Sequence, residues 1–448
     1  MTTQSSALQE HVGTADRPCI DCLHDAAHVR RDRLVAPRPI AFWLVAGLLA
    51  ITLLGTTLPT PLYVIYQARW HFSSGIITLI FASYAGGVLA ALLLAGRASD
   101  QVGRRPMLAA ALGLSALSTV TFIFAPDLGW LVVGRILSGL SAGLMTGTGT
   151  ATLTDMVDAS SSRRASLVAT AASTAGLGLG PLIAGLLATF APDPTAVVFA
   201  VYAIALVFAA LGLAVVPETV SPRQKLTLRL SGLTIPSIGR GEFIAAGVAG
   251  FAAYSLIGLF TSLVPTFLGG ELHQHNYAIT GATVSLIFGA STMTQLTLAR
   301  FPSRSVVLTG LGLFVVGLAV IVGALTGASM PLFLLGTVIS GVATGAVFMG
   351  SLATANRLAT AEMRGRVVST YFVFAYGGLT LPVIGVGIAS DYLGDVPAVL
   401  ACSVVLAVLC AFSIRGIRRA GSRQPTSAAP SSGGVSRVVR SRGKEHVA

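Results

Sequence analysis

The sequence predicts an all-α membrane protein with twelve transmembrane helices arranged as two six-helix repeats. The first reason is composition, since 54% of the 448 residues are hydrophobic and only 10% are charged, whereas a soluble domain carries roughly 25% charged residues. The second is that apolar stretches long enough to cross a bilayer as a helix, about 20 residues, recur along the chain. The third is that landmark residues of the first half return in the second half at a nearly constant offset.

Twelve apolar stretches supply the expected helices. The first six are 40–66, 75–95, 106–125, 129–152, 164–190 and 196–216, and the second six are 242–268, 278–298, 305–326, 331–354, 366–390 and 396–415. Residues 1–38 are polar, and we expect a disordered cytoplasmic tail. The interval 217–241 is basic and rich in proline, which predicts a cytoplasmic linker between the bundles 39–216 and 242–415. Residues 416–448 form a second basic cytoplasmic tail, suited to anionic lipid.

The two halves resemble each other in sequence. Gly-Leu-Ser-Ala-Gly at 139–143 matches Gly-Val-Ala-Thr-Gly at 341–345 with an offset of 202, and Pro181 matches Pro382 with an offset of 201. Each pair falls in an equivalent predicted span. We therefore expect parallel repeats related by an axis along the membrane normal.

The distribution of positive charge predicts the orientation. With the amino terminus in the cytoplasm, inside segments carry 27 of the 29 Lys and Arg residues; the exceptions are Arg69, outside, and Arg135, within a span. This asymmetry places both termini in the cytoplasm. It also leaves no contiguous basic surface for nucleic acid, despite a net charge of +12.

One pattern in the first tail could bind a metal ion. Cys19, Cys22, His24 and His28 offer four potential ligands within ten residues. Zinc fingers separate the two ligand pairs by about a dozen residues, so that a fold can form between them. With one residue between the pairs a tetrahedral site would be strained. We therefore favour an incidental sequence over a metal site, and we expect no cofactor.

The stretch 96–108, between the second and third spans, contains a recognisable pattern of glycine and charge. It resembles the loop between helices 2 and 3 of major facilitator superfamily transporters, G-x-x-x-D-x-x-G-R-[RK]. The matching residues are Gly96, Asp100, Gly103, Arg104 and Arg105. The resemblance implies a latch between the halves that forms and breaks during alternating access, with Asp100 capping the helix that begins near 364–368. A static loop that only directs membrane insertion is the alternative.

Arg135 is the only charge clearly inside a predicted span. Because a mid-membrane arginine costs about 2.5–3.5 kcal/mol, it should face the bundle interior or water. Leu131, Arg135 and Gly139 resemble the helix-4 motif L-x-x-x-R-x-x-Q-G of drug/proton antiporters, with Ser138 in place of Gln. The resemblance implies a role for Arg135 in proton coupling, and Asp155 at the inner end of the same helix is a second candidate. The alternative is an arginine that extends outward to the membrane surface.

The fifth span contains a glycine–proline pattern. It resembles the antiporter motif G-x-x-x-G-P-x-x-G-G through Gly176, Gly180, Pro181 and Gly185, with alanine at 184. Proline removes a backbone hydrogen bond and bends the helix, and glycine allows close packing. In the resembled family this motif marks exporters. A Pro-Glu-Thr run at 217–219 adds to the resemblance, which covers about residues 40–415.

In the resembled family, helices 1, 4, 7 and 10 line the substrate cavity, and helix 11 adds to it. The candidates share hydroxyl, aromatic or methionine side chains: Thr57, Thr60, Tyr63, Tyr254, Phe260, Phe348, Met349, Phe372 and Tyr376. Aromatic and methionine side chains with few charges suit apolar or weakly polar molecules, and the absence of acids from the cavity argues against strongly cationic substrates.

We therefore expect a secondary transporter that exports small compounds, as in multidrug efflux, by proton antiport and alternating access. Its partners would be a small-molecule substrate, protons and the lipid bilayer, and we expect a monomer in the plasma membrane. Enzyme activity is not expected: the G-x-S-x-G match at 139–143 lies within a helix with no strand before it. A sugar, amino acid or other metabolite transporter of the same fold is one alternative, and a non-transporting membrane receptor or scaffold is another.

Overall fold

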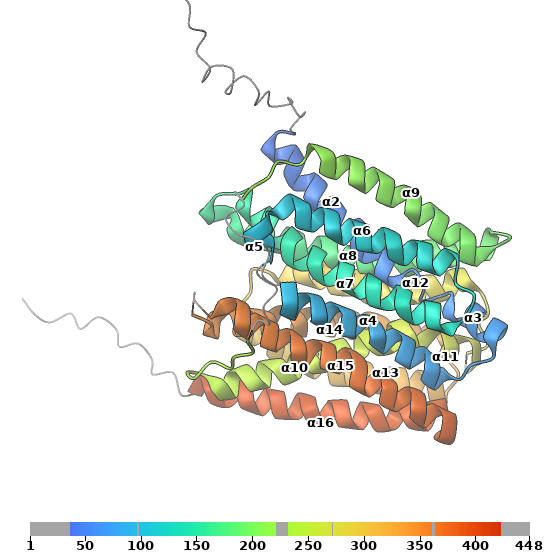
Figure 1. Ribbon diagram of the computed structural model, residues 1–448. Coiled ribbons are helices and arrows are strands. Elements are labelled where there is room, and N and C mark those ends of the chain that lie inside the picture. The colour runs from blue at the N-terminus through green and yellow to red at the C-terminus, as the bar shows by residue number, and fades with distance from the viewer. Residues whose placement is uncertain (1–35, 96–97, 221–231, 271, 361–362, 423–448) are drawn as a thin grey trace, which may run out of the picture.

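The computed structural model describes residues 36–95, 98–220, 232–270, 272–360 and 363–422, and these ranges contain helices and turns but no β-strand. Twelve helices within them have 20 to 30 residues (Figure 1). The first bundle contains α2 (Arg38–Thr57), α4 (Ser74–Ala95), α6 (Arg104–Ile123), α7 (Leu128–Asp155), α8 (Ser162–Phe190) and α9 (Pro194–Val215). The second contains α10 (Arg240–Ser262), α12 (Tyr277–Leu298), α13 (Ser303–Thr326), α14 (Met330–Leu358), α15 (Arg364–Leu393) and α16 (Asp395–Ser422). At about 1.5 Å per residue, each is long enough to cross a bilayer.

Eleven of these described helices are also apolar enough to be membrane spans, and α12 is the exception. Its 22 residues include many serines and threonines. Their hydroxyls donate to carbonyl oxygens one turn back, as Thr283 does to Ile279 and Thr294 to Ala290, which satisfies them within the helix. α12 packs against α14 of the second bundle and also against α8 of the first. It therefore completes the second bundle and the predicted set of twelve long helices.

The predicted spans 40–66 and 242–268 are each interrupted, which corrects the prediction of one continuous helix. α2 ends at Thr57, and a turn containing Pro59 precedes α3 (Tyr63–Trp70). α10 ends at Ser262, and α11 (Val264–Gly270) starts with Pro265 in its first turn. Proline lacks a backbone N–H and clashes with the preceding turn, so it ends one helix and is tolerated at the start of the next. The same interruption occurs at equivalent places in the two halves.

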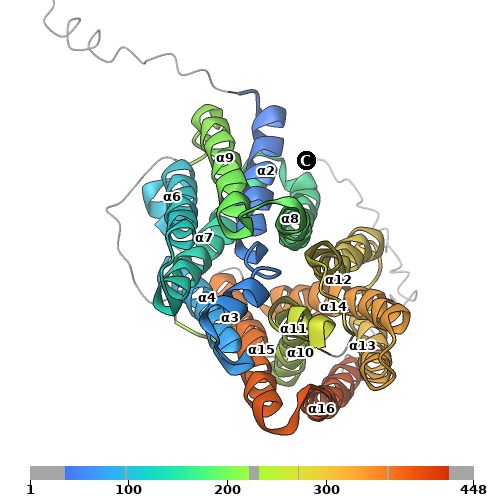
Figure 2. The same ribbon diagram turned by 90° about the vertical axis from the view of Figure 1, so that its right-hand side faces the viewer.

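The two ends of the molecule are distinct in Figure 1. The start of α2, the end of α16 and the short helix α5 (Ala98–Val102) lie at one end, which we call the tail end. The short helices α3 and α11 lie at the opposite end. Two seams join the bundles: α8 packs against α12, and α4 packs against α15 (Figure 2).

Glycines set the distance between helices within each bundle. A Cβ atom on Gly139 of α7 would lie 2.1 Å from the Tyr84 carbonyl oxygen of α4, and one on Gly341 of α14 would lie 2.6 Å from the Ile287 carbonyl oxygen of α12. The pentapeptides matched in the sequence therefore make the same kind of contact in the two halves. Close backbone approach through small residues is how membrane helices gain packing energy without a hydrophobic driving force.

Enlarging Gly139 should destabilise the protein. We expect Gly139→Leu to lower the thermal unfolding midpoint in detergent by several degrees, because overpacking a tight contact costs about 1–3 kcal/mol. Gly147 of the same helix, where a Cβ would meet nothing within 4 Å, provides the matched control Gly147→Leu, which should change the midpoint little. Equal shifts in the two variants would contradict the packing described here.

Candidate functional site

Aromatic side chains from three helices of the second bundle meet near the seams. The Tyr254 ring of α10 lies 5.5 Å from the Phe348 ring of α14 and 5.4 Å from the Tyr376 ring of α15. Phe372 of α15 lies 6.2 Å from Tyr376. All four side chains are only partly buried, unlike the rings of the bundle cores. We call these four residues the central aromatic group.

Tyr84 of α4 approaches this group from the first bundle. It belongs to the cluster of buried side chains against which Tyr254 and Tyr376 pack. Residues of both bundles therefore surround the same region. A region with walls from both halves is the geometric requirement for alternating access.

Arg135 of α7 is fully buried inside the first bundle. Its Nη1 atom donates a hydrogen bond to the Thr56 carbonyl oxygen of α2 at 2.5 Å. Three ring centroids lie 5.4 to 5.5 Å from its Cζ atom, those of Tyr63, Phe81 and Tyr84. Such cation–π contacts are worth about 0.5–2 kcal/mol each. The guanidinium thus faces the bundle interior, beside the tyrosine that reaches the central aromatic group.

One face of the glycine–proline stretch of α8 packs on α2. A Cβ on Gly176 would lie 2.3 Å from the Ala50 carbonyl oxygen, so only glycine fits there. Because Pro181 has no N–H, the Leu177 carbonyl oxygen one turn back loses its helical donor. The Thr57 hydroxyl of α2 donates to that oxygen at 2.8 Å. A side chain of α2 therefore replaces the hydrogen bond that the proline removes.

The other face of the same stretch packs on α12, across the seam. A Cβ on Gly185 would lie 2.3 Å from the Tyr277 carbonyl oxygen, and one on Gly281 would lie 2.1 Å from the Pro181 carbonyl oxygen. The Ser285 hydroxyl donates to the Gly178 carbonyl oxygen at 2.6 Å. The motif therefore joins α8 to its own bundle and to the other bundle at once.

The loop between α4 and α6 forms a network of ion pairs with the end of α7. Arg104 pairs with Asp100 at 2.6 Å and with Asp155 at 2.9 Å. Its Nη1 atom also donates to the Ser99 hydroxyl. Asp155 is therefore bound in this network at the tail end, at the last residue of α7, and not beside Arg135.

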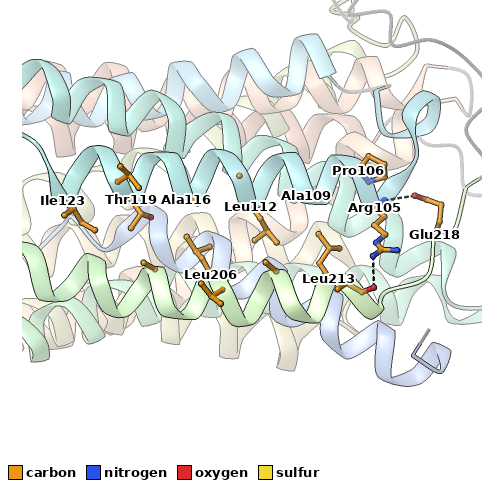
Figure 3. Close-up of a pocket in the computed structure, with 16 residues that line it drawn as sticks. Arg105, Pro106, Ala109, Leu112, Ala116, Thr119, Ile123, Leu206, Leu213 and Glu218 are labelled. Atoms are coloured by element: carbon orange, nitrogen blue, oxygen red, sulfur yellow. Dashed lines mark hydrogen bonds between the residues drawn. The ribbon is translucent and has the colours of Figure 1, made fainter. Parts of the chain in front are cut away.

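Glu218, which follows α9, caps the first turn of α6. Its carboxylate accepts hydrogen bonds from the backbone N–H groups of Arg104 at 2.8 Å and Arg105 at 3.0 Å, which stabilises the positive end of the helix. Figure 3 shows this cap, together with the Arg105 guanidinium donating to the Ala214 carbonyl oxygen. Gly103 has φ +109°, and a Cβ there would lie 2.8 Å from Glu218 Oε2, so the turn requires glycine.

A groove of about 880 Å³ lies between α6 and α9, next to this cap (Figure 3). Most of its lining is apolar, as at Leu112, Leu206 and Leu213. Both helices lie at the edge of the first bundle, away from the seams (Figure 2). This face meets lipid in a bilayer, so the region around the central aromatic group, rather than the groove, is the candidate transport site.

Comparison with known families decides the identity of the fold. Residues 45–301 match the family model of the Major Facilitator Superfamily. The chain belongs to the Major Facilitator Superfamily. Family and fold indicate a transporter rather than an enzyme. This facilitator is therefore a multi-pass membrane protein that binds small-molecule substrates and lies in a lipid bilayer.

Two curated relatives of this facilitator carry multidrug names. It is 27% identical over 270 residues to the multidrug resistance protein MdtL of Shewanella oneidensis, an alignment that covers 59% of this chain and 67% of the relative. It is 30% identical over 257 residues to the multidrug transporter MdfA of Yersinia pestis, covering 55% of this chain and 61% of the relative. The matches thus span about two thirds of these relatives or less.

The fold of the facilitator is similar to that of solved transporters. A bacterial homologue of the human lysosomal transporter Spinster, in an inward-facing and occupied conformation, superposes with a TM-score of 0.68 at 14% sequence identity. The match covers 85% of this chain and 97% of the other. At this identity the comparison concerns the fold alone.

The nine predicted cavity residues divide into two sets. Five are only partly buried: Tyr254, Phe348, Met349, Phe372 and Tyr376. Four are fully buried: Thr57, Thr60, Tyr63 and Phe260. Phe260 stacks on Phe333 with 6.1 Å between ring centroids, which places it in the core of the second bundle. Thr57 donates its hydroxyl hydrogen bond to the Leu177 carbonyl oxygen of α8.

In this structure Asp100 does not make the predicted contact with the start of α15. α15 begins at Arg364 after Met363, without a side-chain hydrogen bond at its N-cap, whereas Asp100 pairs with Arg104, four residues along the chain. Because that arginine is only one turn away, the carboxylate is satisfied within the first bundle. Several residues singled out in the sequence lie outside the described ranges: Gly96, Cys19, Cys22, His24 and His28.

Sequence reasoning gave no role to three residues of this site. Glu218 stands in the Pro-Glu-Thr run, and an acid directly after a helix is a signal that could have suggested a cap. Tyr84 and the Thr56 carbonyl have no such signal, because nothing in the local sequence shows that α4 and α2 approach Arg135.

The hydrogen bond from Thr57 to Leu177 should depend on Pro181. We expect Thr57→Val to lower the free energy of unfolding by about 1 kcal/mol, and by much less in a Pro181→Ala background, where the new N–H can bond to Leu177. A double-mutant cycle measured by unfolding in mixed detergent gives this coupling. Thr52→Val is the matched control, because Thr52 bonds to Leu48 within its own helix and its effect should be the same in both backgrounds. Additive effects of Thr57→Val and Pro181→Ala would contradict the assignment.

Proposed function

We propose that this facilitator exports small, apolar or weakly polar compounds, as in drug efflux, in exchange for protons. The observation that carries the proposal is the double contact of α8, whose glycine–proline stretch packs on α2 and on α12 at once. A helix held closely to both bundles can transmit their relative motion while sealing the seam. The multidrug names of the two relatives agree with export.

The central aromatic group suits such compounds. Phenyl and phenol rings provide large apolar contact area and a small number of hydroxyl groups that orient a ligand. Their partial burial between the bundles fits a site that binds substrate in one state and releases it in the other. Strongly cationic compounds would be disfavoured by the neighbouring charge of Arg135.

Proton coupling is assigned to Arg135 and Asp155. The two lie on the same helix at different depths, since Asp155 is the last residue of α7 and Arg135 lies 20 residues earlier, about 30 Å along the helix axis. A proton on Asp155 would weaken its pairing with Arg104 and loosen the loop network. In this proposal the ion pairs of Arg104 with Asp100 and Asp155 break and re-form as the bundles move between the two states of alternating access.

The orientation proposed for the membrane places both tails in the cytoplasm, following the distribution of Lys and Arg. The tail end is then cytoplasmic, and the end with α3 and α11 faces outward. At that outer end Thr189 of α8 accepts a hydrogen bond from the Ala278 N–H of α12 at 3.0 Å. Thr78 of α4 there lies against Gly387 of α15. The protein acts in the plasma membrane and, in this proposal, as a monomer.

Export is tested in cells that accumulate fluorescent dyes and antibiotics. Cells with the wild-type protein should hold less of at least one compound of a broad panel, and a protonophore should abolish the difference. Arg135→Met should remove at least 90% of it while membrane insertion, measured on blots of membrane fractions, is retained. Arg304→Met, which changes an exposed arginine of the second bundle, is the control and should keep export. Accumulation unaffected by the protonophore would refute proton antiport.

A further inference from the structure

One edge of the Arg135 guanidinium has no hydrogen-bond partner. Nη1 donates to Thr56, whereas Nε and Nη2 are buried and bond to nothing in the described part of the chain. The N–H groups of these two atoms point in parallel from the same edge of the planar group. That edge is the one that binds a carboxylate through two parallel hydrogen bonds.

The positive charge of Arg135 is also uncompensated. None of the ion pairs in the described ranges includes it. The surrounding rings of Tyr63, Phe81 and Tyr84 stabilise a cation through their faces, but they do not accept hydrogen bonds in the plane of the guanidinium. A fully buried cation without a counterion is costly, so the site favours an anion over a neutral group.

Three hydroxyl groups in the stretch of chain that includes Tyr63 are buried and unpartnered as well. They belong to Thr60, Tyr63 and Tyr66, in the turn after α2 and the first turn of α3. The Tyr63 hydroxyl lies close to the guanidinium without a hydrogen bond of good geometry, and Tyr66 lies near Tyr63. Hydroxyl groups can donate to an anion, so these residues add to the same binding chemistry.

Tyr84 connects this anion site to the candidate transport site. Its ring centroid lies 5.4 Å from Arg135 Cζ, and Tyr254 and Tyr376 pack against the buried cluster to which Tyr84 belongs. A compound with an aromatic body among the central rings would therefore have its charged end next to Tyr84, on the side of the group that leads to Arg135.

We infer that Arg135 binds the carboxylate of transported compounds, so that the proposed class of mainly apolar substrates is narrowed to amphipathic monocarboxylates with an aromatic body. The inference rests on the proposed function, since it concerns the substrates of the same site. It is tested by binding alone, without transport.

The test compares two ligands of the same shape, 1-naphthoate and the neutral 1-naphthalenemethanol. Isothermal titration into the full-length protein in neutral detergent should give a Kd for naphthoate at least tenfold below that for the alcohol. Arg135→Met should remove this preference, whereas the control Arg304→Met should keep it.

A second pair of variants retains the arginine, in case Arg135→Met does not fold. Tyr63→Phe and Thr60→Val each remove one hydroxyl with little change in shape, and each should weaken naphthoate binding two- to fivefold while binding of the alcohol is unchanged. Chloride alone is titrated as a competitor and should need concentrations at least a hundredfold higher than naphthoate.

Equal affinities for the two ligands, or naphthoate binding unchanged in Arg135→Met, would overturn the inference, and so would chloride binding as tightly as naphthoate. Loss of dye export with the carboxylate preference intact would refute only the proposed function. Export without any carboxylate preference would refute only this inference.

Discussion

In a bilayer the hydrophobic effect does not drive helices together, because lipid tails are as apolar as leucine, so the halves of this facilitator associate through close backbone contacts at small residues. The contact of α8 with α12 shows this most clearly, since a Cβ at Gly185 or Gly281 would overlap a carbonyl oxygen of the other helix. At the α4–α15 seam a glycine meets a side chain instead, because a Cβ at Gly387 would lie 2.5 Å from the Thr78 methyl carbon. Contacts of this kind hold the two bundles close together.

The proline of α8 couples this seam to the rest of the first bundle. Pro181 frees the Leu177 carbonyl oxygen, and Thr57 at the end of α2 bonds to it. α2 ends at that same residue, next to the turn that leads to Tyr63 and the Arg135 site. The seam, the interruption of the first span and the buried arginine are therefore neighbours along one short stretch of chain.

Much of the fold could be predicted from the sequence, because lipid imposes simple rules on helix length and composition. Even α12, which is not among the helices apolar enough to be spans, was predicted as a long helix. The interruptions at Pro59 and Pro265 were missed although the prolines are a sign of a helix end, because the apolar residues around them form a run long enough for one continuous span. The ion pair between Asp100 and Arg104 was also missed. Arg104 and the start of α15 could both bind the Asp100 carboxylate, and the sequence does not show which of them lies closer to it.

The candidate site was predicted only in part. Aromatic residues on α10, α14 and α15 could be chosen because the family resemblance indicates which helices line the cavity. Phe260, on one of the same helices, instead packs against Phe333 in the core, since one face of a cavity-lining helix must still bury its side chains. Tyr84 could not be chosen, because its place in the site depends on packing with Arg135 and Tyr376. That packing exists only once the two bundles are assembled.

The central claim is that the two bundles rotate about the α8–α12 and α4–α15 seams. Double electron–electron resonance on a protein without native cysteines tests it most directly, with one label pair at Asp158 and Arg300 on the tail end and another at Phe190 and His275 on the opposite end. The account predicts that protonation and substrate change the two distances in opposite directions, one widening by at least 5 Å as the other narrows. Distances that stay fixed at both ends, or that widen together, would contradict it.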